Sequence, residues 1–188
     1  TIDIRMTPAD VTKLVNWQTA NGWAFDLAFN ADGSDAVIAD DGSDPLTTAF
    51  TAPGTESQFT WINHTYSHSF LGCIQIFPTV VGQTWRCATA ADQALNLDPA
   101  LAPSNATLVN GVVYLNQSKI AEQVQKNQAW AAAHGLTHFD PSVLVTGEHS
   151  GLATLPQQPV DNPFLAPALS ATGVEVTASD ASRESTSR

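Results

Sequence analysis

Two of the five histidines, His64 and His68, lie four positions apart in the segment "FTWINHTYSHSF", residues 59–70. A spacing of four keeps both side chains on one side of a helix or a strand. Neutral imidazoles are good ligands for Zn²⁺, Fe, Co and Ni, and a third ligand with an open position would make the centre catalytic. A polar loop with two hydrogen-bonded histidines would give the same pattern, so the spacing alone leaves both interpretations open.

Further ionisable groups follow strands that we predict later in the chain. Glu148 and His149 lie in a glycine-flanked turn, where they could bind substrate, orient a base or make structural hydrogen bonds. Ser150 is out of register for the G-x-S-x-G nucleophile elbow, so a serine hydrolase is weakly supported. Asp180 and Arg183 end the last predicted strand. An arginine beside a carboxylate would keep it ionised, and a plain surface ion pair is the alternative.

A second pair, His134 and His138, has the same spacing. It flanks Gly135, the predicted end of a helix, where the helix dipole favours a cation. We interpret this pair as structural.

The elements that must position these groups alternate between helix and strand. Helices are predicted over 7–21, 45–52, 116–135 and 162–173, and strands over 23–30 and 57–63. Two further segments are predicted to begin as strands: 142–152 runs into a turn, and 174–184 ends in a polar exit. The first helix begins at Thr7-Pro8, a typical cap and first-turn pair, and ends at Asn21-Gly22. Residues 31–45 are predicted to be a loop rich in aspartate and glycine, 69–115 an irregular insertion, and 185–188 a polar tail.

This order predicts an α/β fold with a parallel sheet or barrel. We treat 1–188 as a single domain of catalytic type or a large part of one, since a closed (β/α) barrel needs about 250 residues. In such folds the site lies at the carboxyl ends of the strands. The polar residues expected at those ends are Asn30, His64 with His68, Glu148 with His149, and Asp180 with Arg183.

The charge limits the classes of partner. With 18 acidic and 7 basic residues the chain carries a net charge of −11, which argues against binding to nucleic acid or to an anionic membrane surface. A neutral or cationic partner such as an amino sugar is compatible. No apolar run approaches the 18 residues of a membrane span.

Cys73 and Cys87 are the two cysteines of the chain. In an oxidising compartment they would close a loop worth roughly 3 kcal/mol. Two buried thiols are the alternative, and we favour the disulfide because the segment between them reads as an insertion that needs a cross-link.

"NHTYSH" resembles the H-(S/T)-x-x-H metal motif of the polysaccharide deacetylases, the NodB-like carbohydrate esterases. With "TGEHSGL" and "SDASRE" it is similar to the secreted galactosaminogalactan deacetylase-like branch, and the resemblance spans roughly residues 7–184. It implies a distorted (β/α) barrel, incomplete over this length, in an extracellular or cell-wall enzyme. The activity implied is metal-dependent removal of N-acetyl groups from an amino-sugar polysaccharide.

The resemblance also implies roles for individual residues. His64 and His68 would hold one divalent metal, with zinc the first candidate and cobalt, nickel and iron the others. Catalytic roles are expected for His149, Asp180 and Arg183, and substrate-binding roles for Asn30, Glu148 and Tyr66.

The family takes its third ligand and its general base from an Asp-Asp motif on an earlier strand. Asp40 and Asp41 resemble that motif, but their distance in sequence from His64 leaves no room for the intervening elements, so a solvated turn is favoured there. We expect the true pair upstream of Thr1. The arginine usual in the family's third motif is also absent from "TGEHSGL".

Three other functions remain compatible with the sequence. The first is a non-catalytic glycan-binding or adhesion domain on the same fold. The second is a metal-independent glycosidase with a carboxylate pair such as Glu148 and Asp180. The third is a structural fragment with no activity of its own.

Overall fold

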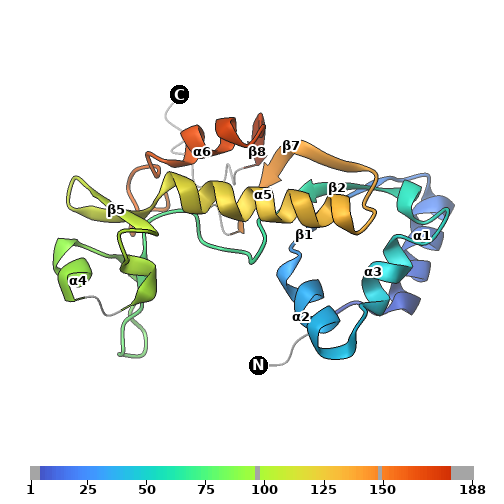
Figure 1. Ribbon diagram of the computed structural model, residues 1–188, viewed down its shortest axis with the longest axis horizontal. Coiled ribbons are helices and arrows are strands. Elements are labelled where there is room, and N and C mark those ends of the chain that lie inside the picture. Colours follow the sequence, from blue (N-terminus) through green and yellow to red (C-terminus); the bar gives the residue numbers. More distant parts are fainter. Residues whose placement is uncertain (1–4, 96–97, 148–149, 179–188) are drawn as a thin grey trace.

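The computed structural model describes residues 5–95, 98–147 and 150–178 (Figure 1). The helices are α1 (Pro8–Asn21), α2 (Asp32–Asp41), α3 (Pro45–Phe50), α4 (Ala90–Leu95), α5 (Gln117–Ala133) and α6 (Leu165–Ala171), with short 3₁₀ turns at Glu56–Gln58 and Pro99–Leu101. The strands are β1 (Phe25–Phe29), β2 (Phe59–Asn63), β3 (Gln75–Ile76), β4 (Arg86–Cys87), β5 (Ala106–Val109), β6 (Val112–Leu115), β7 (Phe139–Val145) and β8 (Val176–Ala178).

The main sheet has four parallel strands in the order β1-β2-β7-β8. This confirms the predicted parallel α/β arrangement, because each long predicted strand enters the same sheet in the same direction. Phe25 pairs with Phe59 and Phe29 with Asn63, so β1 and β2 end side by side. Their carboxyl ends bring Asn30 and His64 to one edge, as expected. Closure into a barrel stays a prediction.

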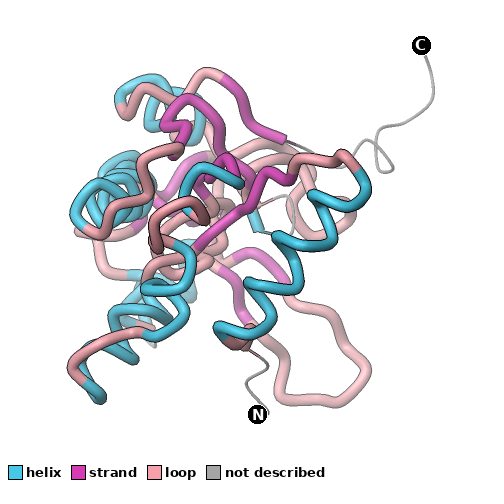
Figure 2. Tube along the Cα trace, turned by 90° about the vertical axis from the view of Figure 1, so that its right-hand side faces the viewer, coloured by secondary structure: helices cyan, strands magenta, loops and turns pink. Residues whose placement is uncertain are grey.

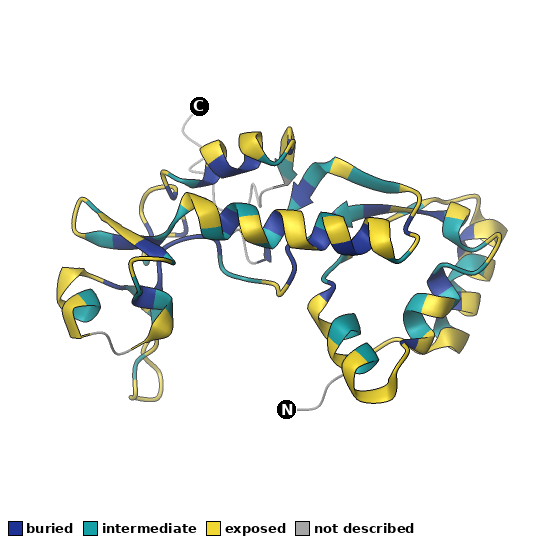
Figure 3. Cartoon of the chain, in the orientation of Figure 1, coloured by how far each residue is buried: buried dark blue, intermediate teal, exposed yellow. Residues whose placement is uncertain are grey.

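Helix α5 joins the two ends of the molecule (Figures 1 and 3). Its predicted inward residues are buried: Trp130 packs in an aromatic core with Trp61 and Phe50, and Ile120 and Val124 pack in a second core. The tube view shows the strands in the middle of the molecule, with helices on more than one side of them (Figure 2). None of the helices in the described part of the chain has the length and apolar character that crossing a membrane requires.

The predicted loop over 31–45 is wrong in its first part, because residues 32–41 form α2. Ala31, fully buried, precedes the helix, and Asp32 and Asp35 lie in its first turn, where the helix dipole favours negative charge. Gly42 ends the helix with a positive φ of 79°. The aspartates that suggested a loop therefore stabilise a helix start.

The segment 69–115 is more regular than predicted. It contains the antiparallel pairs β3-β4 and β5-β6, helix α4, and a small core around Ile74, Leu101 and Val113. The Cys73–Cys87 disulfide is confirmed, with its Cα atoms 5.4 Å apart. In Figure 1 this insert gathers around the start of α5, at the opposite end from α1, α2 and α3.

Candidate metal centre

The two histidines belong to a tight loop that leaves the end of β2. Thr65 and His68 have positive φ angles of 63° and 54°, a region that costs a β-branched residue such as threonine conformational energy. Such strain persists only where the surroundings impose it. Contacts with the surrounding structure therefore stabilise the conformation of this loop, and these contacts define the site.

Two buried asparagines hold the loop from beneath. The side-chain oxygen of Asn63 accepts hydrogen bonds from the Thr65 amide and from Asn127 Nδ2, both at 2.9 Å. Asn127 also donates to the Phe29 carbonyl at 2.9 Å and accepts from the Ala31 amide at 3.0 Å. Both side chains are fully buried. Together they tie the ends of β1 and β2 to helix α5.

Asn30 holds the loop from the end of β1. Its Nδ2 donates to the carbonyls of His64 and of Thr65, the latter at 2.8 Å. Sequence reasoning placed Asn30 beside the histidines and expected it to bind substrate. Its amide donors are directed at the loop backbone, and this geometry favours a positioning role.

The two imidazoles lie side by side, with ring centroids 4.6 Å apart and planes inclined by 64°. His64 Nδ1 is 2.6 Å from the carbonyl oxygen of Val145, the last residue of β7. Since a carbonyl only accepts, Nδ1 carries the proton and Nε2 keeps its lone pair. Metal-binding histidines are typically oriented by such a bond.

Burial lowers the pKa of His64 below its usual value, and the neighbouring His68 lowers it further, while the hydrogen bond to Val145 opposes the shift. The net effect keeps the ring neutral at pH 7. A neutral imidazole with a fixed tautomer is the form that binds a metal ion.

His68 is exposed, and its ring lies against the backbone of Gly147 just after β7. A Cβ atom at position 147 would lie 2.5 Å from His68 Nε2, so any larger residue would displace the ring. Nearby in sequence, the hydroxyl groups of Thr65, Thr146 and Ser150 are buried without a hydrogen-bond partner among the described residues. Buried polar groups normally have a partner, so these three hydroxyls are exceptions in the segments that contain His64, His68 and Gly147.

Tyr66 lies between the two histidines, but its ring is only 7% exposed. Its hydroxyl donates to Asp35 Oδ2 at 2.6 Å, while Trp130 Nε1 donates to Asp35 Oδ1 at 2.7 Å. Burial, followed by the nearby Asp35 carboxylate, raises the pKa of Tyr66. Lys126 Nζ lies 3.6 Å from the ring centroid and covers one face. The substrate-stacking role expected for Tyr66 is not what this geometry favours, because the ring anchors the loop to α2.

The separation of the two rings is compatible with two ligands of one metal ion. Two imidazoles bound to one Zn²⁺ at tetrahedral angles have ring centres about 5 Å apart, close to the distance found here. No third histidine, cysteine, aspartate or glutamate completes a metal-binding group within residues 5–95, 98–147 and 150–178. Asp40 and Asp41 lie exposed in the last turn of α2, roughly 12 Å along the helix from its start. The predicted site residues Glu148, His149, Asp180 and Arg183 lie outside the described residues.

Sequence reasoning missed Asp35, Asn63 and Asn127. A signal existed for Asn127, because it shares the buried stripe of α5 with Val124 and Ala131, at the helical spacings of three and four residues. A polar residue on an apolar stripe needs a buried partner.

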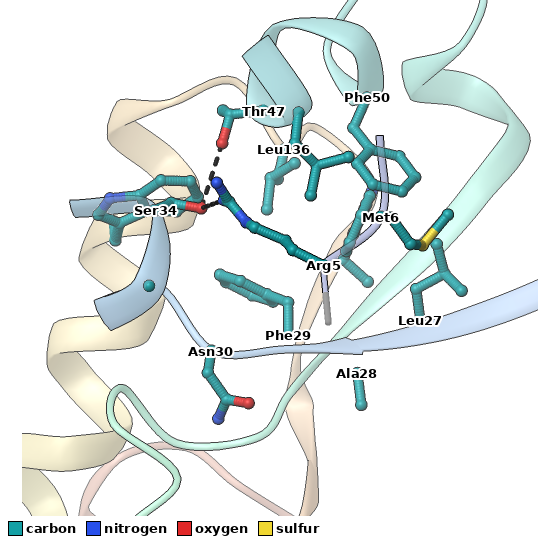
Figure 4. Close-up of a pocket in the computed structure, with 14 residues that line it drawn as sticks. Arg5, Met6, Leu27, Ala28, Phe29, Asn30, Ser34, Thr47, Phe50 and Leu136 are labelled. Atoms are coloured by element: carbon teal, nitrogen blue, oxygen red, sulfur yellow. Dashed lines mark hydrogen bonds between the residues drawn. The ribbon is translucent and has the colours of Figure 1, made fainter. Parts of the chain in front are cut away.

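A separate cavity of about 250 Å³ lies between β1, α2 and α3 (Figure 4). Its walls are aromatic and aliphatic, including Phe29, Phe50 and Trp61. Arg5 lies along it and binds Ser34 at 3.0 Å and Asp44 at 2.6 Å. Arg5 is the one ionisable side chain among the described residues that line this cavity, so its walls offer no acid–base pair.

Comparison with known proteins gave no match: no family model, no curated protein sequence and no solved structure resembles the chain closely enough to report. The assignment of function therefore depends on the geometry of the site and on the motif resemblance alone.

Proposed function

We propose that the protein is a metal-dependent hydrolase that removes N-acetyl groups from an amino-sugar polysaccharide. The observation that carries this proposal is the hydrogen bond of His64 Nδ1 to the Val145 carbonyl, with the His68 ring 4.6 Å away. That bond fixes the tautomer with a free Nε2, and burial keeps the ring neutral. The resemblance of "NHTYSH" to the deacetylase motif points to the same two ligands.

In this proposal His64 and His68 hold one divalent cation, with zinc the first candidate. A bound divalent cation supplies Lewis acidity toward the acetyl carbonyl and lowers the pKa of water to about 7. Asn30 and Asn63 hold the backbone of the loop, and the Val145 carbonyl fixes the orientation of the His64 ring. The catalytic roles proposed are those of His149, Asp180 and Arg183, and Glu148 would bind substrate; all four lie outside the described residues.

The charge and the disulfide support the same proposal. Deacetylation makes the polymer cationic, and a chain with a net charge of −11 attracts a cationic polymer at long range. A disulfide such as Cys73–Cys87 persists in oxidising surroundings, which is compatible with an extracellular or cell-wall location.

The test compares the two histidine pairs. Metal-free protein is incubated with Zn²⁺, desalted and analysed by mass spectrometry, and acetate release is measured on a partly acetylated galactosamine polymer. We expect about one metal ion per chain in the wild type, loss of that metal in His64→Ala/His68→Ala, and retention in the matched control His134→Ala/His138→Ala. Equal metal content in both double variants would overturn the proposal.

The rival function is glycan binding without catalysis. It is favoured by one observation, the lack of a third ligand within the described residues. It predicts that the polymer binds, that no acetate is released with Zn²⁺ or Co²⁺ present, and that the His64→Ala/His68→Ala variant binds polymer as well as the wild type.

A further inference from the structure

A groove of about 370 Å³ opens between the insert and the start of α5. It is near the lower end of the volumes that hold small ligands. Its lining combines aromatic rings with amide, hydroxyl, carboxylate and ammonium groups: Ser69, Phe70, Gln75, Phe77, Asp98, Asn105, Lys119 and Gln123. This mixture contrasts with the apolar walls of the cavity at Arg5.

The groove begins beside the histidine loop. Ser69, which lines it, follows His68 directly in the chain. The Ser67 amide donates to Gln123 Oε1 at 3.0 Å, and the hydroxyls of Ser67 and Ser69 lie 2.9 Å apart. Gln123 therefore belongs both to the support of the loop and to the groove wall. A chain-like ligand lying at His68 would extend into this groove.

Several polar atoms in the groove have hydrogen-bonding capacity to spare. Asp98 Oδ1 caps the turn at Ala100 with a 2.8 Å bond, and Oδ2 has no hydrogen-bond donor among the described residues. Asn105 donates through Nδ2 to the Pro99 carbonyl and keeps its oxygen as an acceptor. Lys119 Nζ donates to Glu122 at 2.6 Å, so its ammonium group already has an acidic partner. Asp98 is the acidic side chain of the described lining.

The aromatic part of the groove is exposed. Phe77 is 67% exposed, although burying a phenylalanine is favourable. Phe70 packs edge-on against Trp85, with ring centroids 5.3 Å apart, which fixes its orientation. Flat apolar rings beside polar acceptors suit a pyranose, which has an apolar face of C–H groups and a polar rim of hydroxyls.

The wall that carries these groups is cross-linked. Cys73 lines the groove, and its disulfide joins the segment just before β3 to Cys87 in β4. A Cβ at Gly72 would lie 2.2 Å from Gln158 Oε1 and 2.4 Å from the Phe70 ring, so only glycine permits this packing. Gln158, fully buried, accepts from the Cys73 amide at 2.7 Å. These contacts fix the wall of the groove at Phe70, Gly72 and Cys73.

We propose that this groove binds the hexosamine unit next to the one presented to His64 and His68, and that Asp98 favours a unit that already carries a free amine. The proposal rests on the proposed function, since it assumes an amino-sugar polymer. The ammonium group of a deacetylated unit would donate to Asp98 Oδ2, and its ring would pack on Phe77. The protein would then prefer polymer that is already partly deacetylated beside the next acetyl group.

The test measures binding to metal-free protein, so it does not depend on a metal or on turnover. The probes are a galactosamine tetramer and its fully N-acetylated counterpart, titrated calorimetrically at pH 6. We expect the wild type to bind the deacetylated tetramer more tightly. Asp98→Asn, which keeps the cap on Ala100, should bring the two affinities within about twofold of each other. Phe77→Ala should weaken both by about five- to tenfold.

The controls separate this proposal from the metal proposal. Exposed Val81→Ala, elsewhere in the insert, should bind like the wild type. His64→Ala/His68→Ala should lose metal but keep the preference for the deacetylated tetramer, because Asp98 and Phe77 are unchanged in it. Wild-type protein that binds neither tetramer, or variants at Asp98 and Phe77 that bind like the wild type, would overturn the groove assignment whatever the metal content proves to be.

Discussion

The chain contains two histidine pairs with identical spacing and different surroundings. His64 and His68 lie at the carboxyl ends of parallel strands, and a backbone carbonyl orients one of the rings. His134 and His138 flank the end of α5, where the His134 ring stacks on Trp130 with centroids 4.1 Å apart and planes inclined by 16°. In the first pair the two rings lie side by side, whereas in the second pair the end of a helix separates the two residues.

The difference shows what a spacing of four leaves undetermined. The first loop turns sharply at Thr65 and again at His68, and this brings the two rings to 4.6 Å. Gly135 breaks the second segment with a φ of 79°, and His138 follows exposed after the turn. The hydrogen bonds of Asn30, Asn63 and Asn127 hold the loop that brings the first pair together. Substitutions in this network therefore test the comparison.

The largest effect is expected at Asn127, which supports only the first pair. Asn127→Leu would leave the buried Ala31 amide without its partner, and it would remove one of the hydrogen bonds made by the Phe29 carbonyl and one made by Asn63. We expect the free energy of unfolding to fall by about 3 kcal/mol, because buried groups without partners lose their full solvation. Urea unfolding measures this.

Gln125→Leu is the matched control for Asn127, as an exposed position on the same helix. Its stability should change by no more than about 0.5 kcal/mol. The importance of the asparagine network would be refuted by equal midpoints for the two variants.

The glycines beside the two pairs give the second contrast. Gly147→Ala should push the His68 ring away from His64, because the new Cβ would lie 2.5 Å from His68 Nε2, and Zn²⁺ affinity should fall at least about tenfold. Gly135→Ala meets no atom within 4 Å but strains a positive φ, so it should cost about 1 kcal/mol of stability and leave Zn²⁺ affinity unchanged. Zinc titrations and thermal unfolding of both variants decide this, and the reverse pattern would contradict it.

The order of helices and strands was predictable because the spacing of apolar residues and the residues that end an element are local features of the sequence. Apolar residues alternate in 23–30 and in 57–63, which predicts the strands β1 and β2 that the structure contains. The pair Asn21-Gly22 predicts the end of α1. The hairpin β5-β6 also had a local signal that we did not use: Asn110-Gly111, with φ angles of 50° and 84°, is the usual two-residue turn between antiparallel strands.

The arrangement of the site was not predictable, because it depends on partners far apart in the chain. The bond between Asn63 and Asn127 joins residues 64 positions apart, and Tyr66 reaches Asp35 across 31 positions. Nothing local distinguishes Tyr66 as a buried anchor from an exposed ring. Burial and orientation arise only when β1, β2 and α5 pack together.

The third contrast concerns pH. Because burial lowers the pKa of His64, the unfolded chain binds more protons than the folded protein below pH 6.5. The stability contributed by the neutral ring is present above that value and is lost as the pH falls toward the folded pKa. We expect metal-free wild type to unfold at lower urea at pH 5 than at pH 7, and His64→Gln, whose amide can still donate to Val145, to show less of this loss. If His138→Gln reduced the loss of stability at pH 5 as much as His64→Gln does, the two histidine pairs would not differ in pH dependence.

The smallest effect is expected from His134→Ala. Loss of the stack on Trp130 should cost about 0.5–1 kcal/mol, since a stacked aromatic pair contributes that much beyond its buried area. His134→Phe should recover most of that stability, because a flat ring can stack without any nitrogen. Zinc affinity should be the same in wild type and both variants. A loss of Zn²⁺ in His134→Ala would mean that the second pair also binds metal, and the distinction between an oriented pair and a merely spaced one would have to be abandoned.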